Sequence, residues 1–403
     1  MTIDIVVGQA LFLGLMAMTG LLLQRLLKLD LTLACLLAGI GYGWLVPVIG
    51  FDTGVRAHTL KDLVFFVILP VLIFEAAWHI KPHLLKRWLI PALLLAIPGV
   101  LISCFVTAAL VYWGIGHPAG FPWIAALLTG AILAATDPVA VVAKLKALKA
   151  PEDLGTLIEG ESLFNDASAV VLFAVVLALA TGAGAEREQS ALVTFLATFF
   201  GGAVSGAVCG LIAAIVVLLL RSVAATSLVL VFTAFGSFYL AEHLLHVSGI
   251  MAVMLAAIVT RFCLREQTHT FLVGAGITWD WLGMFFNAVL FALMGLVITF
   301  EMFSSQWLAI LIVIPALLVG RAVAITVASL LSRLLGKPVP GNWQITLVWG
   351  GLRGAIAIAL ALSLPLSLDY WWTIQSMVFG LVLFTLLVQG TTTGPLIRKL
   401  GIA

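Results

Sequence analysis

The chain has 403 residues, of which 63% are hydrophobic and only 9% are charged. Soluble domains carry about 25% charged residues, so this composition excludes a soluble enzyme, and it also excludes a disordered chain or a disulfide scaffold. The formal net charge of +2 excludes a nucleic-acid-binding protein, which would need a concentrated basic patch. The four cysteines stand alone in apolar runs, without the CxxC spacing of metal or redox sites. We therefore expect a polytopic membrane protein.

Long apolar runs predict transmembrane helices, because about 20 residues are needed to cross a ~30 Å hydrocarbon core. We expect an all-α protein with about thirteen spans, which together form a single membrane domain over residues 1–403. The approximate ranges of the spans, in chain order, are 5–24, 31–50, 62–79, 89–114, 121–143, 154–180, 191–220, 224–246, 248–264, 279–300, 307–331, 343–366 and 372–396.

The spacing of these spans contains a repeat. Adding roughly 216–222 residues to the starts of the first six spans gives the starts of the last six, and the seventh span remains as a linker helix. Corresponding spans are seven apart, an odd number, so they must cross the membrane in opposite directions. The spacing therefore predicts two inverted six-helix repeats, which is an architecture of secondary transporters.

Lys and Arg are distributed unevenly between the two sides of the predicted membrane domain. Fifteen lie in the loops that follow the odd-numbered spans or at the C-terminal end, and three lie in the opposite loops. The positive-inside rule then predicts a cell-membrane protein with its N-terminus outside and its C-terminus in the cytoplasm. The two remaining bases, Arg321 and Arg353, lie inside spans.

Five acidic residues lie well inside the predicted spans: Glu75, Asp137, Glu159, Glu161 and Asp166. A charge at the centre of a membrane costs about 2.5–3.5 kcal/mol, so these side chains must face one another or a water-filled cavity. Such residues typically mark an ion path. A cluster of purely structural ion pairs is the alternative, and it explains the two arginines better than it explains the excess of carboxylates.

The fifth span, 121–143, contains the sequence Thr136-Asp137-Pro138. Pro138 has no N–H, so the carbonyl of Ala134 loses its helical partner, and the ring disfavours helical geometry at Asp137. An unwound turn at membrane depth is tolerated only where it lines protein or water. This turn would present a carboxylate, a hydroxyl and free carbonyl oxygens, which are hard ligands suited to an alkali cation. A simple proline kink with a solvated Asp137 is the alternative.

The twelfth span, 343–366, corresponds to the fifth in the predicted repeat. Three of the five residues in its segment 350–354 are glycine, which predicts a second helix break at the matching position. Two broken, crossing helices at corresponding places in the two halves are the best sequence indication of a transporter site.

The sixth span, 154–180, carries polar residues at helical spacing. Ser162 and Asp166 are four residues apart and share one face, while Glu161 and Asn165 form the adjoining stripe. Asp166 lies near the middle of the span, where a carboxylate is most expensive. This pattern predicts a helix that lines an ion path.

Together, the segments 136–141, 159–166 and 350–355 resemble the NhaP-type sodium/proton antiporters, in the branch of the monovalent cation/proton antiporter superfamily that includes the animal sodium/hydrogen exchangers. The resemblance covers essentially the whole chain. It implies a homodimer in which an ion-translocating core, 89–180 and 307–396, moves like an elevator against a dimerisation scaffold, 5–79 and 191–300. The implied activity is exchange of Na⁺ or Li⁺ for H⁺ across the lipid bilayer, without a cofactor and without enzymatic chemistry.

The resemblance also implies a role for each site residue. The aspartate that matches Asp166 carries both the cation and the proton. Glu161 is expected to pair with an arginine, for which Arg321 is the first choice and Arg353 the second. The remaining implied ligands of Na⁺ are Asp137, Ser162, the backbone carbonyl of Thr136 and Glu75.

The stoichiometry follows from Asn165, an amide that cannot titrate and that stands where electrogenic relatives carry a second aspartate. We therefore expect electroneutral exchange of one cation for one proton. A K⁺/H⁺ antiporter of the same fold is the main alternative, and a proton-gated cation channel is a weaker one. An intramembrane aspartyl protease could use Asp137 and Asp166, but it would leave Asn165 without a role.

Overall fold

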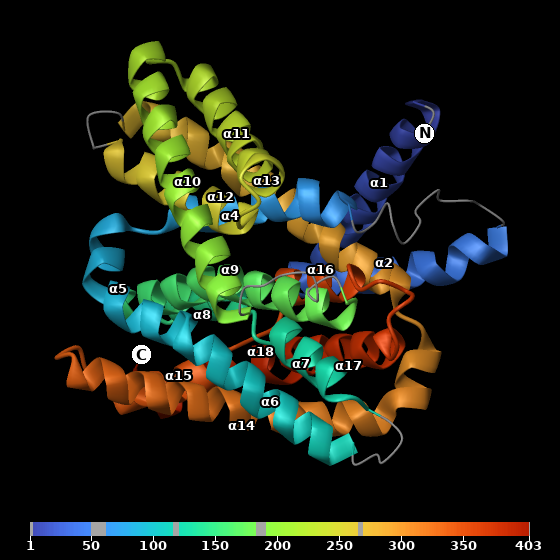
Figure 1. The fold of residues 1–403 in the computed structure, drawn as a ribbon. Helices are drawn as coiled ribbons and strands as arrows, with labels where there is room; N and C mark the ends of the chain where they lie inside the picture. Colours follow the sequence, from blue (N-terminus) through green and yellow to red (C-terminus); the bar gives the residue numbers. More distant parts are fainter. Residues whose placement is uncertain (1–2, 50–61, 116–120, 183–190, 265–268, 403) are drawn as a thin grey trace.

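The computed structural model describes residues 3–49, 62–115, 121–182, 191–264 and 269–402, and these are helical without a β-strand (Figure 1). The elements of the first half are α1 (Ile3–Leu27), α2 (Leu31–Ile49), the π-helical turn η1 (Val64–Ile68), α4 (Leu69–His79), α5 (Pro82–Ala96), α6 (Pro98–Ile115), α7 (Trp123–Ile132), α8 (Val139–Ala147) and α9 (Glu152–Ala180). Those of the second half are α10 (Ala191–Leu220), α11 (Val223–Tyr239), η2 (Leu240–Leu244), α12 (Gly249–Cys263), α13 (His269–Val297), α14 (Phe300–Leu334), α15 (Gly341–Trp349), α16 (Ala355–Leu362), α17 (Trp371–Phe384), η4 (Thr385–Gln389) and α18 (Gly390–Lys399).

The predicted all-α membrane architecture is confirmed in its general form. Within the described ranges, eight helices are long and apolar enough to cross a membrane, and four shorter apolar helices of 10–17 residues accompany them. The predicted helix breaks of the fifth and twelfth spans are also present, between α7 and α8 and between α15 and α16. The count of thirteen spans and the inverted repeat remain predictions.

Several predicted boundaries were wrong. The helix of the fourth span begins at Pro82, seven residues before 89, and it includes the basic pair Lys86 and Arg87, whose exposed side chains can keep their charges in water. Two prolines interrupt the same span, one inside α5 and one at the start of α6. The helix of the tenth span begins at His269, ten residues before 279, and the eleventh span lies in a helix of 35 residues with a kink at Gln306.

The most extensive helix packing falls within two groups. In one group α6 packs against α14 and α7, and α5 packs against α9; in the other, α10 packs against α12, and α13 packs against α2 and α4. In Figure 1, α6, α14, α15, α17 and α18 lie in the lower half, whereas α10 to α13 lie above them. These groups coincide with the ranges expected for the core and the scaffold, and the functional division itself stays a prediction.

Glycine allows the closest helix contact of the second group. A Cβ at Gly206 in α10 would lie 2.2 Å from the backbone oxygen of Ala252 in α12, and one at Gly210 would lie 2.6 Å from the oxygen of Ala256. The two helices can approach this closely only because the side chains are missing, as small residues spaced four apart allow in membrane proteins. This stripe of small residues therefore serves packing.

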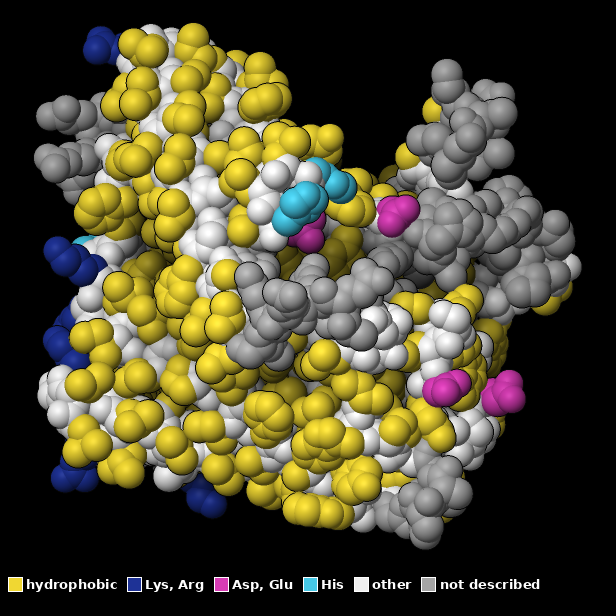
Figure 2. Space-filling model, in the orientation of Figure 1, with side chains coloured by type: hydrophobic (Ala, Val, Ile, Leu, Met, Phe, Trp, Pro, Cys, Tyr) yellow, Lys and Arg dark blue, Asp and Glu magenta, His cyan; other side chains and the backbone are white. Residues whose placement is uncertain are grey.

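The outer surface is largely apolar (Figure 2), as a bilayer requires. Helix α10, for example, exposes Leu196, Phe200, Val204 and Leu211. On the face shown in Figure 2, the Lys and Arg side chains lie toward the left. Figure 1, in the same orientation, marks the C-terminus on this side and the N-terminus on the other. This separation agrees with the sequence-based sidedness, and the orientation in the membrane stays a prediction.

Candidate ion-binding site

The two broken helices meet at their unwound segments. The backbone N–H of Asp137 donates to the carbonyl of Leu352 over 2.8 Å, and the two residues form an antiparallel bridge. Helix α7 already ends at Ile132, and Pro138 is the N-cap residue of α8, whereas glycines open the segment before α16. A Cβ at Gly354 would lie 1.9 Å from Oδ2 of Asp137, so glycine is required for this close approach.

Arg353 satisfies the carbonyls that the break in the fifth span leaves free. Its Nη1 donates to the oxygens of Ala134 and Ala135 over 3.0 and 2.7 Å, and the whole side chain is buried. A cation suits this place, because the carbonyl end of a helix carries partial negative charge. Arg353 thus holds the crossover together and does not pair with Glu161, for which it was the second choice.

Glu161 pairs with Arg321, the first choice from the sequence. Nη1 and Nη2 of Arg321 each lie 3.2 Å from one carboxylate oxygen of Glu161, and both residues are buried. The Nε of Arg321 donates to the carbonyl of Leu347 at the end of α15. The pair is therefore bidentate and connects α9, α14 and α15. Its geometry removes the Glu161 carboxylate from the cavity described next.

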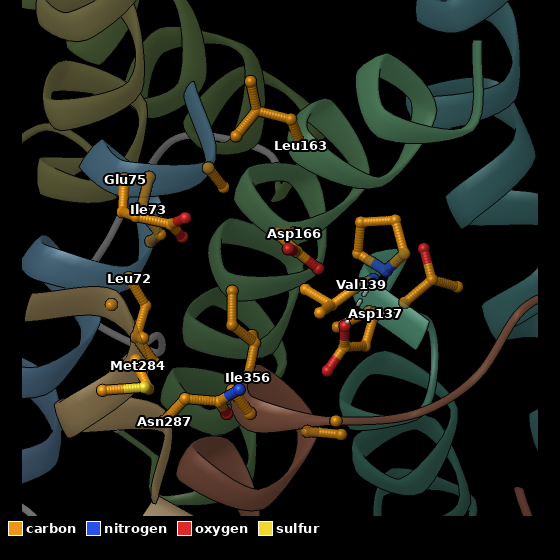
Figure 3. A pocket seen from close by; sticks show the side chains of 18 of the residues that line it. Leu72, Ile73, Glu75, Asp137, Val139, Leu163, Asp166, Met284, Asn287 and Ile356 are labelled. Carbon is orange, nitrogen blue, oxygen red and sulfur yellow. Dashed lines mark hydrogen bonds between the residues drawn. The ribbon is translucent and has the colours of Figure 1, made fainter. Parts of the chain in front are cut away.

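A cavity of about 290 Å³ lies beside the crossover. Four of the predicted ion ligands line it: Asp166 from α9, Thr136 and Asp137 from the unwound segment, and Glu75 from α4. In Figure 3 the carboxylates of Asp166 and Asp137 lie close to each other, whereas Glu75 extends from the opposite wall. The structure thus brings the two aspartates together and separates Glu75 from them by the width of the cavity.

Polar side chains behind this wall of the cavity form hydrogen bonds with one another and with the backbone. The hydroxyl of Ser162 donates to the backbone oxygen of Thr136 over 2.5 Å. The amide of Asn165 donates to Glu161 over 3.0 Å and to the Thr136 hydroxyl over 3.3 Å. Neither Ser162 nor Asn165 lines the cavity, so both act on it through Thr136.

The two aspartates differ in their hydrogen bonds. Oδ1 of Asp137 accepts from the backbone N–H of Val139 over 3.0 Å, as an acceptor does at the start of a helix. Oδ1 of Asp166 is buried, and among the described residues no group donates to it. Leaving a buried acceptor unpaired costs about 1–3 kcal/mol, so Asp166 is the carboxylate that gains most from a proton or a cation.

Helix α13 supplies a wall of the cavity that sequence reasoning missed. Asp280, Gly283, Met284 and Asn287 line it at a spacing of three, four and seven residues, which places them on one helical face. The signal was present in the sequence, since Asp280 and Asn287 interrupt an apolar run two turns apart. Asp280 lies at a predicted span end, and Asn287 lies in a span without an internal acid, whereas the polar residues Thr136, Ser162 and Asn165 were singled out beside Asp137 and Asp166.

At the mouth of the cavity, His79 lies between two acids. Its Nε2 is 2.9 Å from Asp280 Oδ1, and its Nδ1 is 3.4 Å from Glu75 Oε1. These three residues offer metal-ligating atoms within 4.8 Å of one another, but Nδ1 of His79 already lies 2.9 Å from the backbone carbonyl of Glu75. The Asp280 and His79 side chains are 65% and 40% exposed, so we interpret the group as a solvated polar network.

A second cavity of about 500 Å³ adjoins this network and is lined by basic and acidic groups. Lys146 lies 3.6 Å from Glu159, and Lys81 lies 2.6 Å from Glu152. Glu159 therefore belongs to the rim of the molecule and not to the aspartate pair. Of the five acids expected inside spans, Asp137 and Asp166 lie at the crossover, and Glu161 lies in a buried ion pair. The other two, Glu75 and Glu159, lie near the mouth of the first cavity and in the lining of the second.

Comparison with known proteins gives concordant results. Residues 13–399 match the family described as sodium/hydrogen exchanger, transmembrane. The chain is 36% identical to the Na⁺/H⁺ antiporter ApNhaP of Aphanothece halophytica, over 90% of this chain and 70% of that protein. It is 32% identical to the Na⁺/H⁺ antiporter NhaP of Pseudomonas aeruginosa, over 86% of this chain and 83% of that protein. The fold matches the structure of the sodium proton antiporter MjNhaP1 from Methanocaldococcus jannaschii at pH 8, with a TM-score of 0.81, 20% identity, and coverage of 98% and 99% of the two chains.

Proposed function

Because the chain belongs to the sodium/hydrogen exchanger family, as its motifs indicated, we propose that it is a secondary antiporter that exchanges Na⁺ or Li⁺ for H⁺ across the cell membrane. The observation that carries this proposal is the pair of carboxylates, Asp137 and Asp166, on one cavity wall beside an unwound helix crossing. Two acids and the carbonyls of irregular backbone are hard oxygen ligands for an alkali cation. No nucleotide or redox group is needed for this exchange.

The proposed mechanism is competition for Asp166. A carboxylate in a desolvated site favours its neutral form, which it reaches either by binding a proton or by binding a cation. Oδ1 of Asp166 has no described donor, so it is available to both. Asp137 and the two oxygens of Thr136 complete the proposed cation site; Ser162 donates to the backbone oxygen of Thr136, and Asn165 donates to its hydroxyl. Binding of one ion excludes the other, and this exclusion couples the two fluxes.

The proposed stoichiometry is one cation for one proton. Glu161 is held by Arg321, and Asn165 cannot titrate, so neither contributes a proton to the cycle. Asp137 lines the same cavity and is the one neighbouring group at the crossover whose titration would change this ratio. A second displaced proton would move one net charge per cycle, worth about 2.3 kcal/mol per 100 mV.

We propose that access alternates by movement of the core relative to the scaffold within a homodimer. The arrangement of the cavity supports this division. It is lined from one side by residues of α9, α16 and the α7–α8 break, and from the other by residues of α2, α4 and α13. Of these, α7 and α9 belong to the first packing group described above, and α2, α4 and α13 belong to the second, while α16 packs against helices of both. Sliding of one group past the other would carry the aspartates across the membrane and leave the α4 and α13 wall behind.

Proteoliposomes provide the test of exchange and of its stoichiometry. An imposed Na⁺ gradient should drive proton flux in the opposite direction, and replacing Na⁺ by K⁺ separates the proposed activity from K⁺/H⁺ exchange. A potassium–valinomycin potential should leave the zero-flux point unchanged. A clear shift with voltage would refute one-for-one exchange, and conduction of Na⁺ without proton movement would refute the antiporter.

A further inference from the structure

Asn287 lies on the α13 wall of the cavity, opposite the crossover. Its side chain is drawn in Figure 3 between Met284 and Ile356, on the near side of the space that Asp166 and Asp137 face. Its Oδ1 is buried, and within the described part of the chain no group donates a hydrogen bond to it. The lining around it is otherwise apolar, with Leu72 of α4 and Met284 of α13 as neighbours, and with Ile356 of α16 next to it from the core side.

An unpartnered buried amide oxygen works against the stability of the fold. A buried acceptor without a donor forfeits the hydrogen bonds it makes to water, and an apolar side chain of the same shape removes that penalty. Asn287 is therefore not explained by packing, because leucine would fill the same place with no unsatisfied atom. It does not cap a helix either, since it lies within α13, three turns before the end at Val297.

The same oxygen has the chemistry of a weak cation ligand. An amide oxygen is a hard, neutral donor that suits alkali cations, and it carries no charge that a proton could neutralise. Asp280, two turns away on the same face, is 65% exposed and lies at the mouth of the cavity. The face of α13 thus offers one oxygen ligand at the mouth and one deeper inside, on the wall that does not carry the aspartates.

We propose that Asn287 is a specificity-determining residue whose side-chain oxygen binds the alkali cation on its way between the mouth of the cavity and Asp166. This inference rests on the proposed exchange function. A neutral ligand on the scaffold replaces one water of the cation without holding the cation back when the core moves. The residue should therefore set the apparent affinity for the cation and the preference between Na⁺ and Li⁺, and it should not set the coupling to protons.

The test compares Asn287→Leu with Asn287→Asp, which keeps an oxygen at the same place. In proteoliposomes Asn287→Leu should raise the KM for Na⁺ by roughly 3- to 10-fold, which corresponds to the loss of one hydrogen bond or ligand contact. The ratio of the KM values for Na⁺ and Li⁺ should also change. Asn287→Asp should restore or lower the KM. The Tm of Asn287→Leu in detergent should equal or exceed that of the wild type, because an unpaired polar group has been removed.

The matched control is Asn342→Leu, the same change at the start of α15 and outside the cavity, which should leave both KM values unchanged. The inference is overturned if Asn287→Leu keeps wild-type KM values, if it loses folded protein, or if Asn287→Asp raises the KM as much as Asn287→Leu does. Absence of Na⁺-driven proton flux in the wild type would instead refute the proposed function.

Discussion

The two walls of the cavity are built on different principles. On the core side, the crossover is specified by proline and glycine, and polar groups are dense: Arg353 donates to two carbonyls, and Arg321 pairs with Glu161. Within the described residues, Oδ1 of Asp166 and two nitrogens of Arg353 still have no hydrogen-bond partner there. On the α4 and α13 side, polar groups are few, and they are either solvated, like Asp280, or unpartnered, like Asn287. This contrast fits the proposed function, in which the core wall binds the ion and the other wall admits it and releases it.

The largest effect is expected from Asp166→Asn on the core wall. This near-isosteric change removes both the proton acceptor and the negative charge for the cation, so Na⁺-driven proton flux in proteoliposomes should be abolished while a folded protein is still purified. Asp280→Asn, the same change at the mouth, should retain measurable exchange. Wild-type rates in Asp166→Asn, or equal losses in both variants, would contradict the division of labour between the walls.

Gly354→Ala should also impair exchange severely. The new Cβ would lie 1.9 Å from Oδ2 of Asp137, so the carboxylate or the crossover backbone must move, and overpacking of this kind costs about 1–3 kcal/mol. The expected result is a protein that folds but needs much more Na⁺ for half-maximal exchange. Gly276→Ala in α13 is the control, because a Cβ there meets nothing within 4 Å. Equal KM values for the two variants would show that the close approach is unimportant.

Glu161→Ala should reduce stability more than it reduces affinity. It leaves Arg321 buried without its carboxylate, and breaking a buried pair costs about 3–5 kcal/mol. Thermal unfolding in detergent should show a large loss of Tm. Glu159→Ala, on the same helix but opposite an exposed lysine, should cost no more than about 1 kcal/mol. A Glu161→Ala protein as stable as Glu159→Ala would mean that the pair does not hold α9 to α14.

The smallest effect is expected from Gly283→Ala on the α13 wall. Its Cβ would lie 2.7 Å from Cγ of Glu75, which is a flexible side chain that can move toward the mouth. We expect the KM for Na⁺ to rise by less than about tenfold, or ~1.4 kcal/mol. A complete loss of exchange would indicate that Glu75 binds the ion directly beside Asp166, as the family resemblance implied, and not across the cavity.

The core wall was predictable from the sequence and the α13 wall was not, for a physical reason. Pro138 and the glycines of 350–354 change the backbone itself, so the two breaks and the role of Asp137 can be inferred without coordinates. The charge of Glu161 likewise demands a buried base. The partner of the free carbonyls could not be inferred, because nothing in the sequence distinguishes an arginine bound to a carboxylate from one bound to backbone oxygens.

Contacts between distant helices set the rest of the site. Asp280 and Asn287 are ordinary residues of an apolar helix until α13 is packed against α4, which places Asp280 beside His79 and Asn287 deeper in the lining of the cavity. The sequence also could not show that Glu75 lies across the cavity, since its position depends on how the two packing groups meet. Boundaries were least predictable where basic side chains extend from helix ends to solvent, as at Lys86 and Arg87 in α5.

The central claim is that Na⁺ and H⁺ compete for the Asp166 carboxylate, and proton release on cation binding tests it most directly. Purified protein in weakly buffered detergent solution, with a pH indicator, should release about one proton for each Na⁺ bound, as ligand-linked deprotonation of a single group requires. Asp166→Asn should release none. Na⁺ binding without proton release in the wild type, or undiminished release in Asp166→Asn, would contradict the account.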